Sequence, residues 1–502
     1  MSAAVDPDRS EWDVIVLGAG AAGKNAAQYA SQFSGLSAAL VEAELVGGEC
    51  SYWACMPSKG LLRPGEVLDS ARHLPGLAGL VDGRGLDVDA VLARRDEIVH
   101  NLDDASQVEW SLGAGIDVVR GAARLAGARR LELTGPDGST RALTARRAIV
   151  IATGSRAAIP DIPGLAEARP WISRDVTNVH DIPRRAAILG GGVVACEAAT
   201  WLRALGVQEL TVINRGDGLL AGNEPFAGGL VADALRAAGV DVRLNRTIES
   251  VERPGAVDAG PGRSRRAEAA LTLDDGSTLV VDELIVAAGR TPNTDDIGLQ
   301  TVGLEPGGYL DVDDQLTVRG VEGQWLYAVG DVTGKALLTH MGKYQARIAG
   351  AVIAARAAGG YEPHAADGLS ELSVAAGHGA VPQVTFTSPP VGSVGRTEAQ
   401  AREDGIAVET VEYDLAALAG AYVLREGYVG RAKLVIDRAD DTLVGATFVG
   451  DGVAELVHSA TVAIVARAPL AALWHAVPSY PTVSEVWLRL LETLRARRRD
   501  GG

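Results

Sequence analysis

One local pattern occurs twice in this chain of 502 residues: an apolar strand, a glycine-rich turn and an alanine-rich helix. In the first copy, strand residues 13–17 run into Gly18-Ala-Gly20-Ala-Ala-Gly23. In the second, residues 186–189 run into Gly190-Gly-Gly192-Val-Val-Ala195. Each copy predicts a helix N-terminus that faces the pyrophosphate of a dinucleotide. A single copy is a weak signal, but two copies indicate two dinucleotides and therefore an α/β chain with two Rossmann-like domains.

The residue that ends the next strand differs between the copies. Glu42 lies 24 residues after Gly18, and a carboxylate there can accept both ribose hydroxyls of an adenosine. The alternative is a solvated glutamate at a strand end. The same spacing from Gly190 leads to Asn214 and then Arg215. An acid would repel a 2′-phosphate, whereas an amide beside a guanidinium can bind one, so NADPH is favoured and NADH remains possible.

Composition limits the possible partners and the location. The net charge of −17 argues against nucleic acid and anionic membranes, which select for basic surfaces. The chain has no run of about 18–20 apolar residues that could form a membrane helix. The N-terminal residues are polar and acidic and lack a signal segment, so we expect a cytoplasmic protein.

Two of the three cysteines lie close together, in Gly47-Gly48-Glu-Cys50-Ser-Tyr-Trp-Ala-Cys55-Met-Pro57-Ser-Lys59. Cysteines five apart lie about 140° from each other on a regular helix, so a bond between them needs a loop or a distorted turn. Pro57 suits the first turn of a following helix, whose positive end would stabilise a Cys55 thiolate. The alternative is a pair of structural thiols. Cys196 is expected to be a small core residue, and no metal site is expected.

With these motifs the chain resembles the pyridine nucleotide–disulfide oxidoreductases, the family of dihydrolipoamide dehydrogenase, glutathione reductase and mercuric reductase. The resemblance spans essentially the whole chain. Besides both glycine turns and residues 50–59, it is carried by Ala152-Thr153-Gly154, residues 190–197, Ala288-Gly289-Arg-Thr-Pro-Asn293, Tyr327-Ala-Val-Gly-Asp331 and residues 386–395.

The resemblance implies a role for each site residue. Cys55 would contact the flavin of FAD, and Cys50 would be the interchange thiol that meets the acceptor. Lys59 and Glu197 would form an ion pair beside the flavin, and Asp331 would hold its ribityl chain. Further cofactor contacts would come from Gly48, Thr153, Gly154 and Gly289. Electrons would pass from NADPH through FAD and the Cys50–Cys55 disulfide to a small-molecule disulfide or thiol-reactive acceptor.

The resemblance also implies the order of domains. Residues 1–155 and 286–360 would bind FAD, and residues 156–285 would bind NAD(P)H. Residues 361–502 would form an α+β dimerisation domain, so that each site of a homodimer is completed by the partner chain.

The match breaks at the C-terminus. The disulfide reductases of this family carry a His-Pro…Glu motif whose histidine is the base of the dithiol, but here the sequence is Tyr480-Pro481-Thr-Val-Ser-Glu485. Tyrosine, with a pKa near 10, is a poor base at neutral pH. His475 would need a rearranged loop to replace it. A quinone or metal-ion reductase, for example of Hg(II), and an FAD-binding redox sensor with little turnover therefore remain alternatives.

Overall fold

The computed structural model describes residues 9–359 and 370–500, and the chain forms two compact units. The first unit combines Met1–Pro57, Asp96–Ala157 and Arg290–His378, and the second combines Ser58–Arg95, Ala158–Gly289 and Gly379–Gly502. The four domain ranges expected from the sequence stay predictions, and the boundary at 360/361 lies outside the described residues.

The first unit is built on a seven-stranded sheet that contains the first glycine turn. The strand order is β3-β2-β1-β6-β5-β4, and β16 pairs with β6. Strands β1, β2, β3, β6 and β16 are parallel, whereas β4 and β5 are antiparallel. The bounds are β1 Glu11–Leu17, β2 Ala38–Glu42, β3 Ile116–Arg120, β4 Ala122–Leu125, β5 Arg130–Thr134, β6 Thr140–Ile151 and β16 Leu326–Ala328.

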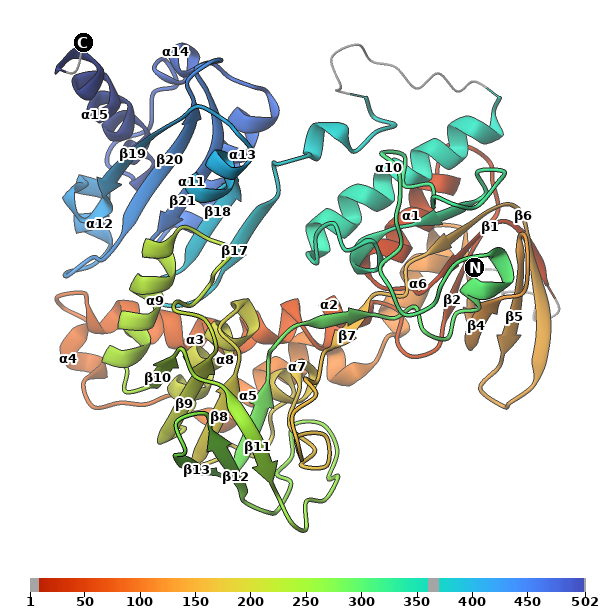
Figure 1. Ribbon diagram of the computed structural model, residues 1–502, viewed down its shortest axis with the longest axis horizontal. Coiled ribbons are helices and arrows are strands. Elements are labelled where there is room, and N and C mark those ends of the chain that lie inside the picture. The colour runs from red at the N-terminus through yellow and green to blue at the C-terminus, as the bar shows by residue number, and fades with distance from the viewer. Residues whose placement is uncertain (1–8, 360–369, 501–502) are drawn as a thin grey trace. The chain divides into compact units, whose positions relative to one another are not determined.

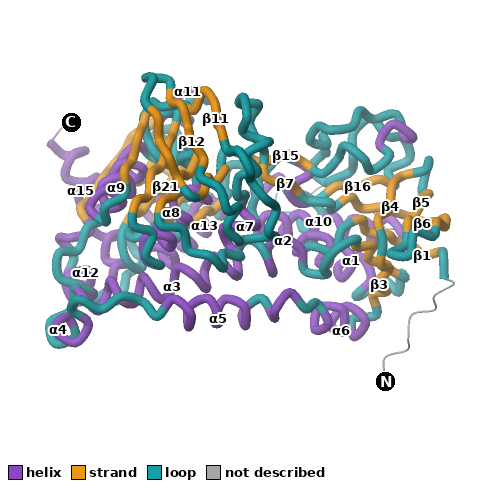
Figure 2. Tube along the Cα trace, turned by 90° about the horizontal axis from the view of Figure 1, so that it is seen from below, coloured by secondary structure: helices purple, strands orange, loops and turns teal. Residues whose placement is uncertain are grey.

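Two long helices of this unit pack side by side. Helix α1 (Ala21–Ser31) follows the glycine turn, and α10 (Thr339–Ala357) lies against it, as Figure 1 shows. The approach is close because α10 presents Gly342 to Ala22: a Cβ at 342 would lie 3.3 Å from the Ala22 Cβ. Helix α6 (Ala105–Gly113) packs beside β3 (Figure 2). This packing places the start of α10 near the start of α1.

The second unit contains the second glycine turn. Its parallel sheet has the order β10-β9-β8-β14, and a separate antiparallel sheet has the order β11-β12-β13. Helix α8 (Val193–Ala204) follows the turn, and α9 is Pro225–Ala237. The strands are β8 Arg185–Leu189, β9 Glu209–Asn214, β10 Asp241–Leu244, β11 Ile248–Glu252, β12 Ala269–Leu273, β13 Thr278–Val281 and β14 Glu283–Val286.

The C-terminal part of the second unit is an antiparallel sheet with helices, ordered β17-β18-β21-β20-β19. Apolar residues of its strands and helices form its core, which includes Phe448 of β21 and Trp487 of α15. Its main elements are β17 Pro382–Thr385, β18 Val391–Gly395, β19 Val408–Asp414, α12 Ala419–Leu424, β20 Arg431–Asp437, β21 Thr442–Val449, α13 Val453–Val465 and α15 Val486–Asp500. The α/β architecture and the α+β C-terminal part expected from the sequence are confirmed.

Residues 253–267 are rich in Gly, Pro and Arg, which is typical of an exposed hairpin or loop. The segment is largely a loop, yet Arg253 and Arg265 are only 6% exposed each. Each is buried with an acid: Arg265 lies 2.9 Å from Asp175, and Arg253 lies 2.9 Å from Glu283. Within the described residues, no helix is both long enough and apolar enough to span a bilayer.

Candidate functional site

The first glycine turn has the shape of a pyrophosphate cradle. A Cβ at Gly18 would lie 2.4 Å from the Ala152 carbonyl oxygen, so the turn is packed tightly on its inner side. A Cβ at Gly20 would meet nothing within 4 Å, and no side chain caps the N-terminus of α1 there. Open space in front of uncapped backbone N–H groups fits the pyrophosphate of FAD. Glu42, at the end of β2, accepts hydrogen bonds from the N–H groups of Ala19 at 2.7 Å and Glu44 at 2.8 Å.

Two other predicted motifs of the first unit meet near Asp331. The Thr153 hydroxyl donates to the Asn293 carbonyl at 2.7 Å, and the Asn293 amide donates back to the Thr153 carbonyl at 3.0 Å. Asp331, just after β16, accepts from the Ser155 hydroxyl at 2.5 Å. The Arg290 guanidinium lies 3.8 Å from Asp331. These contacts hold the Asp331 carboxylate in place at the carboxyl edge of the sheet.

The two cysteines of the predicted pair lie at a break between helices. Cys50 is in the short helix α2 (Gly48–Tyr52), and Cys55 begins α3 (Cys55–Arg72), with Pro57 in its first turn as predicted. Gly48 joins α2 to the glycine turn: it has a φ of +61°, and a Cβ there would lie 2.8 Å from the Gly20 Cα. Glycine is therefore required at this close approach.

Neither cysteine forms a disulfide in the described part of the chain, and both side chains are partly buried. The Cys55 Sγ lies 3.3 Å from the hydroxyl of Thr339, the first residue of α10. A hydrogen bond with the Cys55 side chain raises the pKa of Cys50 above its usual range, and burial adds to the rise. Thr339 and Lys343 lower the pKa of Cys50 in opposition to these effects.

The second unit contains the predicted Lys59–Glu197 ion pair. The Lys59 Nζ lies 2.8 Å from one carboxylate oxygen of Glu197 and 3.1 Å from the other. Glu197 is only 4% exposed and also accepts a hydrogen bond from the Phe386 N–H at 2.9 Å. The Lys59 amine lies 4.7 Å from the centre of the Phe386 ring. The N–H and the ring of Phe386 therefore hold the carboxylate and the amine in place, while the Lys59 side chain remains partly exposed.

At the second glycine turn, the space in front of Gly192 is open, as it is at Gly20 in the first turn. A Cβ at Gly192 would meet nothing within 4 Å, and no side chain caps α8 at this residue. Asn214 lies over Gly191, and its amide nitrogen donates to the carbonyls of Gly218 at 2.9 Å and Gly216 at 3.4 Å. This turn, Asn214 and Asn223 line a cavity of about 340 Å³. Arg215 is exposed beside it. Gly289 has a φ of +141° just after β14.

Among the described residues, no hydrogen bond joins Tyr480, His475 and Glu485 to one another. Tyr480 is 75% exposed, and His475 is exposed as well. Glu485 is 6% exposed, and one of its oxygens accepts from the Arg489 guanidinium at 2.6 Å. Its other oxygen is buried without a hydrogen-bond partner in the described structure.

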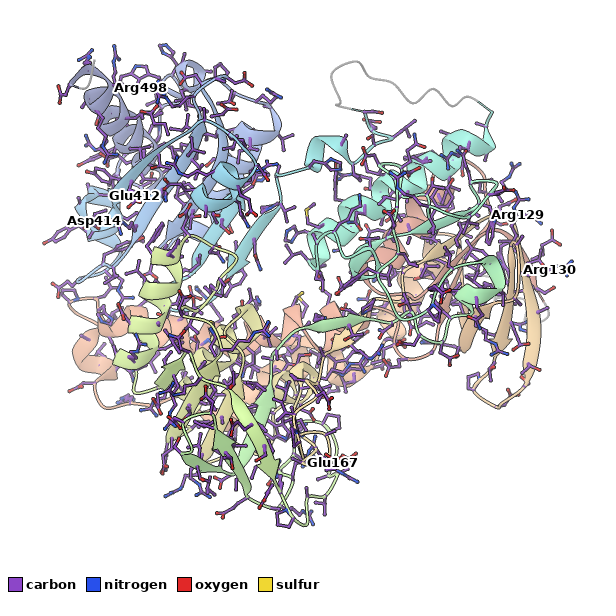
Figure 3. All side chains as sticks on the ribbon, viewed as in Figure 1. Arg129, Arg130, Glu167, Glu412, Asp414 and Arg498 are labelled. Atoms are coloured by element: carbon purple, nitrogen blue, oxygen red, sulfur yellow. The ribbon has the colours of Figure 1, made fainter. Side chains whose placement is uncertain are left out.

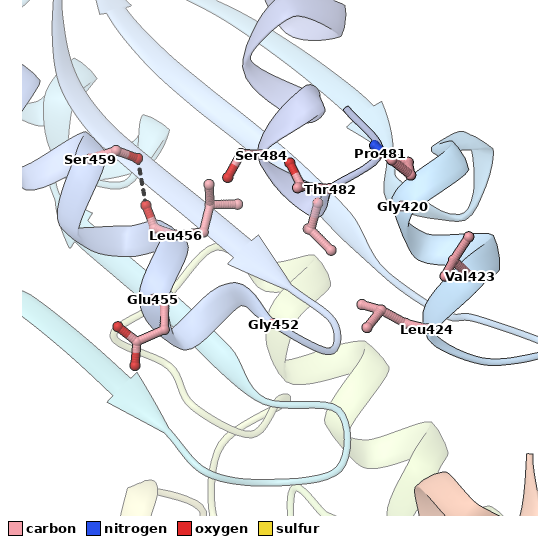
Figure 4. A pocket seen from close by; sticks show the side chains of 11 residues that line it. Gly420, Val423, Leu424, Gly452, Glu455, Leu456, Ser459, Pro481, Thr482 and Ser484 are labelled. Carbon is pink, nitrogen blue, oxygen red and sulfur yellow. Dashed lines mark hydrogen bonds between the residues drawn. The ribbon is translucent and has the colours of Figure 1, made fainter. Parts of the chain in front are cut away.

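The loop after Tyr480 lines a second cavity, of about 410 Å³ (Figure 4). Pro481, Thr482 and Ser484 form one wall, and Val423 and Leu424 of α12 form another. Cys196, a residue of α8, is fully buried in the core, as predicted, and burial raises its pKa to about 12. No contact was predicted for Thr339, Phe386 or Arg489, although Phe386 begins the motif of residues 386–395 and Arg489 lies four residues after Glu485.

Comparisons with known proteins agree along the whole chain. The family described as pyridine nucleotide-disulphide oxidoreductase matches residues 12–358, and its dimerisation domain matches residues 381–490. Dihydrolipoyl dehydrogenase of Chlamydia muridarum is 30% identical over 481 residues, 95% of each chain. Glutathione reductase of Burkholderia cepacia is 30% identical over 97% of this chain and 99% of its own. Mercuric reductase of Lysinibacillus sphaericus is 29% identical over 95% of this chain and 82% of its own.

Solved structures share the fold. The Cu(II) complex of the HOCl-induced flavoprotein disulfide reductase RclA from Escherichia coli has a TM-score of 0.79 and 23% identity, covering 96% of this chain and 99% of its own. LpdA from Mycobacterium tuberculosis has a TM-score of 0.79 and 23% identity, covering 97% of this chain and all of its own.

Proposed function

Because the chain belongs to the pyridine nucleotide–disulphide oxidoreductase family and is an FAD-dependent NAD(P)H disulfide oxidoreductase, we propose that it reduces a small disulfide or thiol-reactive acceptor through Cys50 and Cys55. Its dimerisation domain implies a homodimer. The observation that carries the proposal is the position of Cys50 and Cys55 at the break between α2 and α3, with Thr339 beside Cys55. The cytoplasmic location stays a prediction.

Each residue of the site has a proposed part in this reaction. When bound, FAD supplies the link between hydride transfer from the nicotinamide and thiol–disulfide chemistry. Gly18, Gly20 and Glu42 would bind its pyrophosphate and adenosine, and Asp331 would orient its ribityl chain. The Lys59 amine, held by Glu197, would place positive charge at the flavin. Cys55 would face the flavin as a thiolate, and Cys50 would exchange with the acceptor.

Substitution of each cysteine separates these two parts. Reduction of the wild type by two electrons should produce the long-wavelength absorption of a thiolate beside the flavin. Cys55→Ser should abolish this absorption. Cys50→Ser should show it without reductant, because Cys55 is then a free thiolate. If both variants behave like the wild type, the pair is structural and the proposal fails.

For the nucleotide, we propose NADPH in preference to NADH, with Arg215 as the contact for the 2′-phosphate. The amide nitrogen of Asn214 is engaged by the carbonyls of Gly216 and Gly218, which leaves the neighbouring exposed guanidinium as the group suited to a phosphate. Arg215→Ala should lower kcat/KM for NADPH about tenfold and change that for NADH little. Asn214→Glu should move the preference toward NADH. Equal efficiency with NADH in the wild type would refute this preference.

For the acceptor, the C-terminal residues favour a substrate other than glutathione disulfide or lipoamide. Tyr480 stands where the base of the disulfide reductases is expected, and the Glu485 carboxylate is paired with Arg489. Transfer of electrons to a quinone or to a metal ion such as Hg(II) is the second candidate, since neither requires that base. The similarity to mercuric reductases supports testing it. A screen of disulfides, quinones and Hg(II) with NADPH as donor would discriminate between the two candidates.

A further inference from the structure

Lysine is rare in this chain: it occurs at five positions, 24, 59, 335, 343 and 433, among 47 cationic residues. Arginine is therefore the ordinary cation of this protein. Two of the five lysines, Lys24 and Lys343, lie in the first unit within electrostatic reach of Cys50. An ammonium is a compact point charge on a flexible stem, whereas a guanidinium is broad and planar. Lysine at positions 24 and 343 therefore departs from the chain's general use of arginine.

Lys343 lies near the N-terminus of α10. Thr339 begins this helix, and its hydroxyl lies 3.3 Å from the Cys55 Sγ. Lys343 follows four residues later, so it lies on the same face of the helix one turn away. Its side chain is exposed. The face of α10 that meets the dithiol therefore presents a hydroxyl and then a cation.

Lys24 comes to the same region from α1. Its amine donates to the Gln107 side chain and lies 5.2 Å from the centre of the Trp110 ring, so α6 fixes it in a partly buried position. Burial lowers the pKa of Lys24, and the positive charge of Lys343 lowers it further, while Cys50 acts in the opposite direction. The contact of Gly342 with Ala22 explains why cations on two helices lie within electrostatic reach of one thiol.

Other charged residues lie on the same elements. Glu49 precedes Cys50 in α2, and its carboxylate is 3.8 Å from the Arg290 guanidinium. His340 follows Thr339 and is exposed. Thus Glu49 is partly balanced by Arg290, and the two lysines supply the remaining positive charge at Cys50. The whole chain carries a net charge of −17, so a cationic site at its reactive thiol differs from the rest of the molecule.

We propose that Lys24 and Lys343 form a cationic entrance to Cys50 that selects a disulfide bearing negative charge. The inference rests on the proposed disulfide-reducing function and adds the charge class of the acceptor. The Cys50 thiolate attacks one sulfur of the acceptor, and the acceptor's S–S bond breaks and releases one thiolate, which takes up a proton. Cys55 then attacks Cys50, which forms the Cys50–Cys55 disulfide and releases the second thiol. Two electrons pass to the acceptor, and NAD(P)H restores the dithiol.

Two aromatic disulfides that differ in charge provide the test. The probes are 5,5′-dithiobis(2-nitrobenzoate), which carries two carboxylates, and 4,4′-dithiodipyridine, which is neutral. Their rates with the reduced enzyme are measured in a single turnover, and the ratio of the anionic to the neutral rate reports the local field. Lys343→Gln should lower this ratio about three- to tenfold, because one charge near the reacting thiol is lost. Lys24→Gln should change it in the same direction, and Lys343→Arg should keep most of it.

A matched control removes one positive charge elsewhere in the same unit. Arg130→Gln, at the exposed first residue of β5 (labelled in Figure 3), should leave the ratio unchanged. A second readout needs no turnover: labelling of Cys50 by iodoacetate relative to iodoacetamide, in chemically reduced protein, should fall in both lysine variants. Added salt should reduce the wild-type preference, since the Debye length is about 10 Å at 0.1 M.

The outcomes separate this inference from the proposed function. If the neutral disulfide oxidises the dithiol but the ratio is the same in wild type, Lys24→Gln and Lys343→Gln, the cationic entrance is refuted and the dithiol function stands. If NAD(P)H produces no thiol that reacts with the neutral disulfide, both are refuted. A ratio that falls in both lysine variants and not in Arg130→Gln supports the inference.

Discussion

Among the described residues, the buried carboxylate of Glu197 forms an ion pair with one cation. Lys59 is its ammonium partner, and the Phe386 N–H supplies one further hydrogen bond. Lys59→Met should therefore lower the free energy of unfolding by about 1–3 kcal/mol, a moderate loss because the lysine side chain is 37% exposed. Adding Glu197→Gln should restore most of the stability, but flavin reduction should stay slow in both variants. Urea unfolding and stopped-flow reduction by NADPH measure the two effects, and wild-type behaviour of Lys59→Met in both would contradict them.

Tyr480 offers a test of why the acceptor differs. The wild type should turn over glutathione disulfide and lipoamide very slowly. A positioned general base typically contributes about 10²–10⁴-fold, so Tyr480→His should raise kcat/KM for these substrates. The gain should be partial, because Glu485, the carboxylate that could orient the new imidazole, is held by Arg489. Tyr480→His with Arg489→Leu should gain more, with Arg489→Leu alone as the control. Ordinary wild-type rates with either disulfide would show that another group acts as the base.

At the scale of elements, Asp13 ties β1 to its neighbours. Its carboxylate accepts from the Arg146 guanidinium at 2.9 Å and from the Ser37 hydroxyl at 2.8 Å. The bond with Arg146 is the largest effect on Asp13, and its pKa lies well below the usual range. Because the pKa is depressed in the folded state, the stabilisation is complete above the unfolded value of about 3.9 and is lost as the pH falls below it.

Asp13→Asn should therefore cost about 1–2 kcal/mol of unfolding free energy at pH 7 and at pH 5. The difference from the wild type should shrink at pH 3, where the carboxylate of the unfolded chain is protonated. Urea unfolding at the three pH values measures this. Asp137→Asn, in an exposed turn, is the control and should have a small effect at pH 7. A cost for Asp13→Asn that is independent of pH would show that the charge is not the cause.

Both glycine turns and the strands around them could be predicted because their signals are local. A strand and a glycine turn need only adjacent residues, and the break between Cys50 and Cys55 follows from helix geometry. Thr339 could not be predicted, since it meets Cys55 across 284 residues of sequence. The same is true of Phe386, which donates to Glu197 from 189 residues away. The burial of Arg253 and Arg265 could not be predicted either, because the residues around them are mostly polar, small or turn-forming and the paired acids, Glu283 and Asp175, lie in other segments.

At the scale of the whole molecule, an apolar surface on the dimerisation domain remains uncovered in a single chain. Tyr422 is 78% exposed and Val423 is 66% exposed, both on α12, and Val423 lines the cavity that Pro481 also lines. Exposed apolar side chains gathered beside a cavity are typical of an interaction surface. Since the dimerisation domain implies a homodimer, we expect this surface to be covered by the second copy.

Val423→Glu should therefore shift the protein from dimer to monomer, because it would bury a charge without a partner in the interface. Light scattering across a range of concentrations measures the shift. Phe33→Glu, at a residue 90% exposed in the first unit, is the control and should leave the dimer intact.

Reduction of the flavin by NADPH should persist in the monomer, since each chain has its own glycine turns and its own Lys59–Glu197 pair. We expect Tyr480 to act on the dithiol of the partner chain, so the monomer should lose this group from its site. A positioned general acid or base typically contributes about 10²-fold or more, and acceptor turnover should therefore fall at least about tenfold. A monomeric variant that still reduces the acceptor at the wild-type rate would place the whole site within one chain, and the dimer would then serve stability alone.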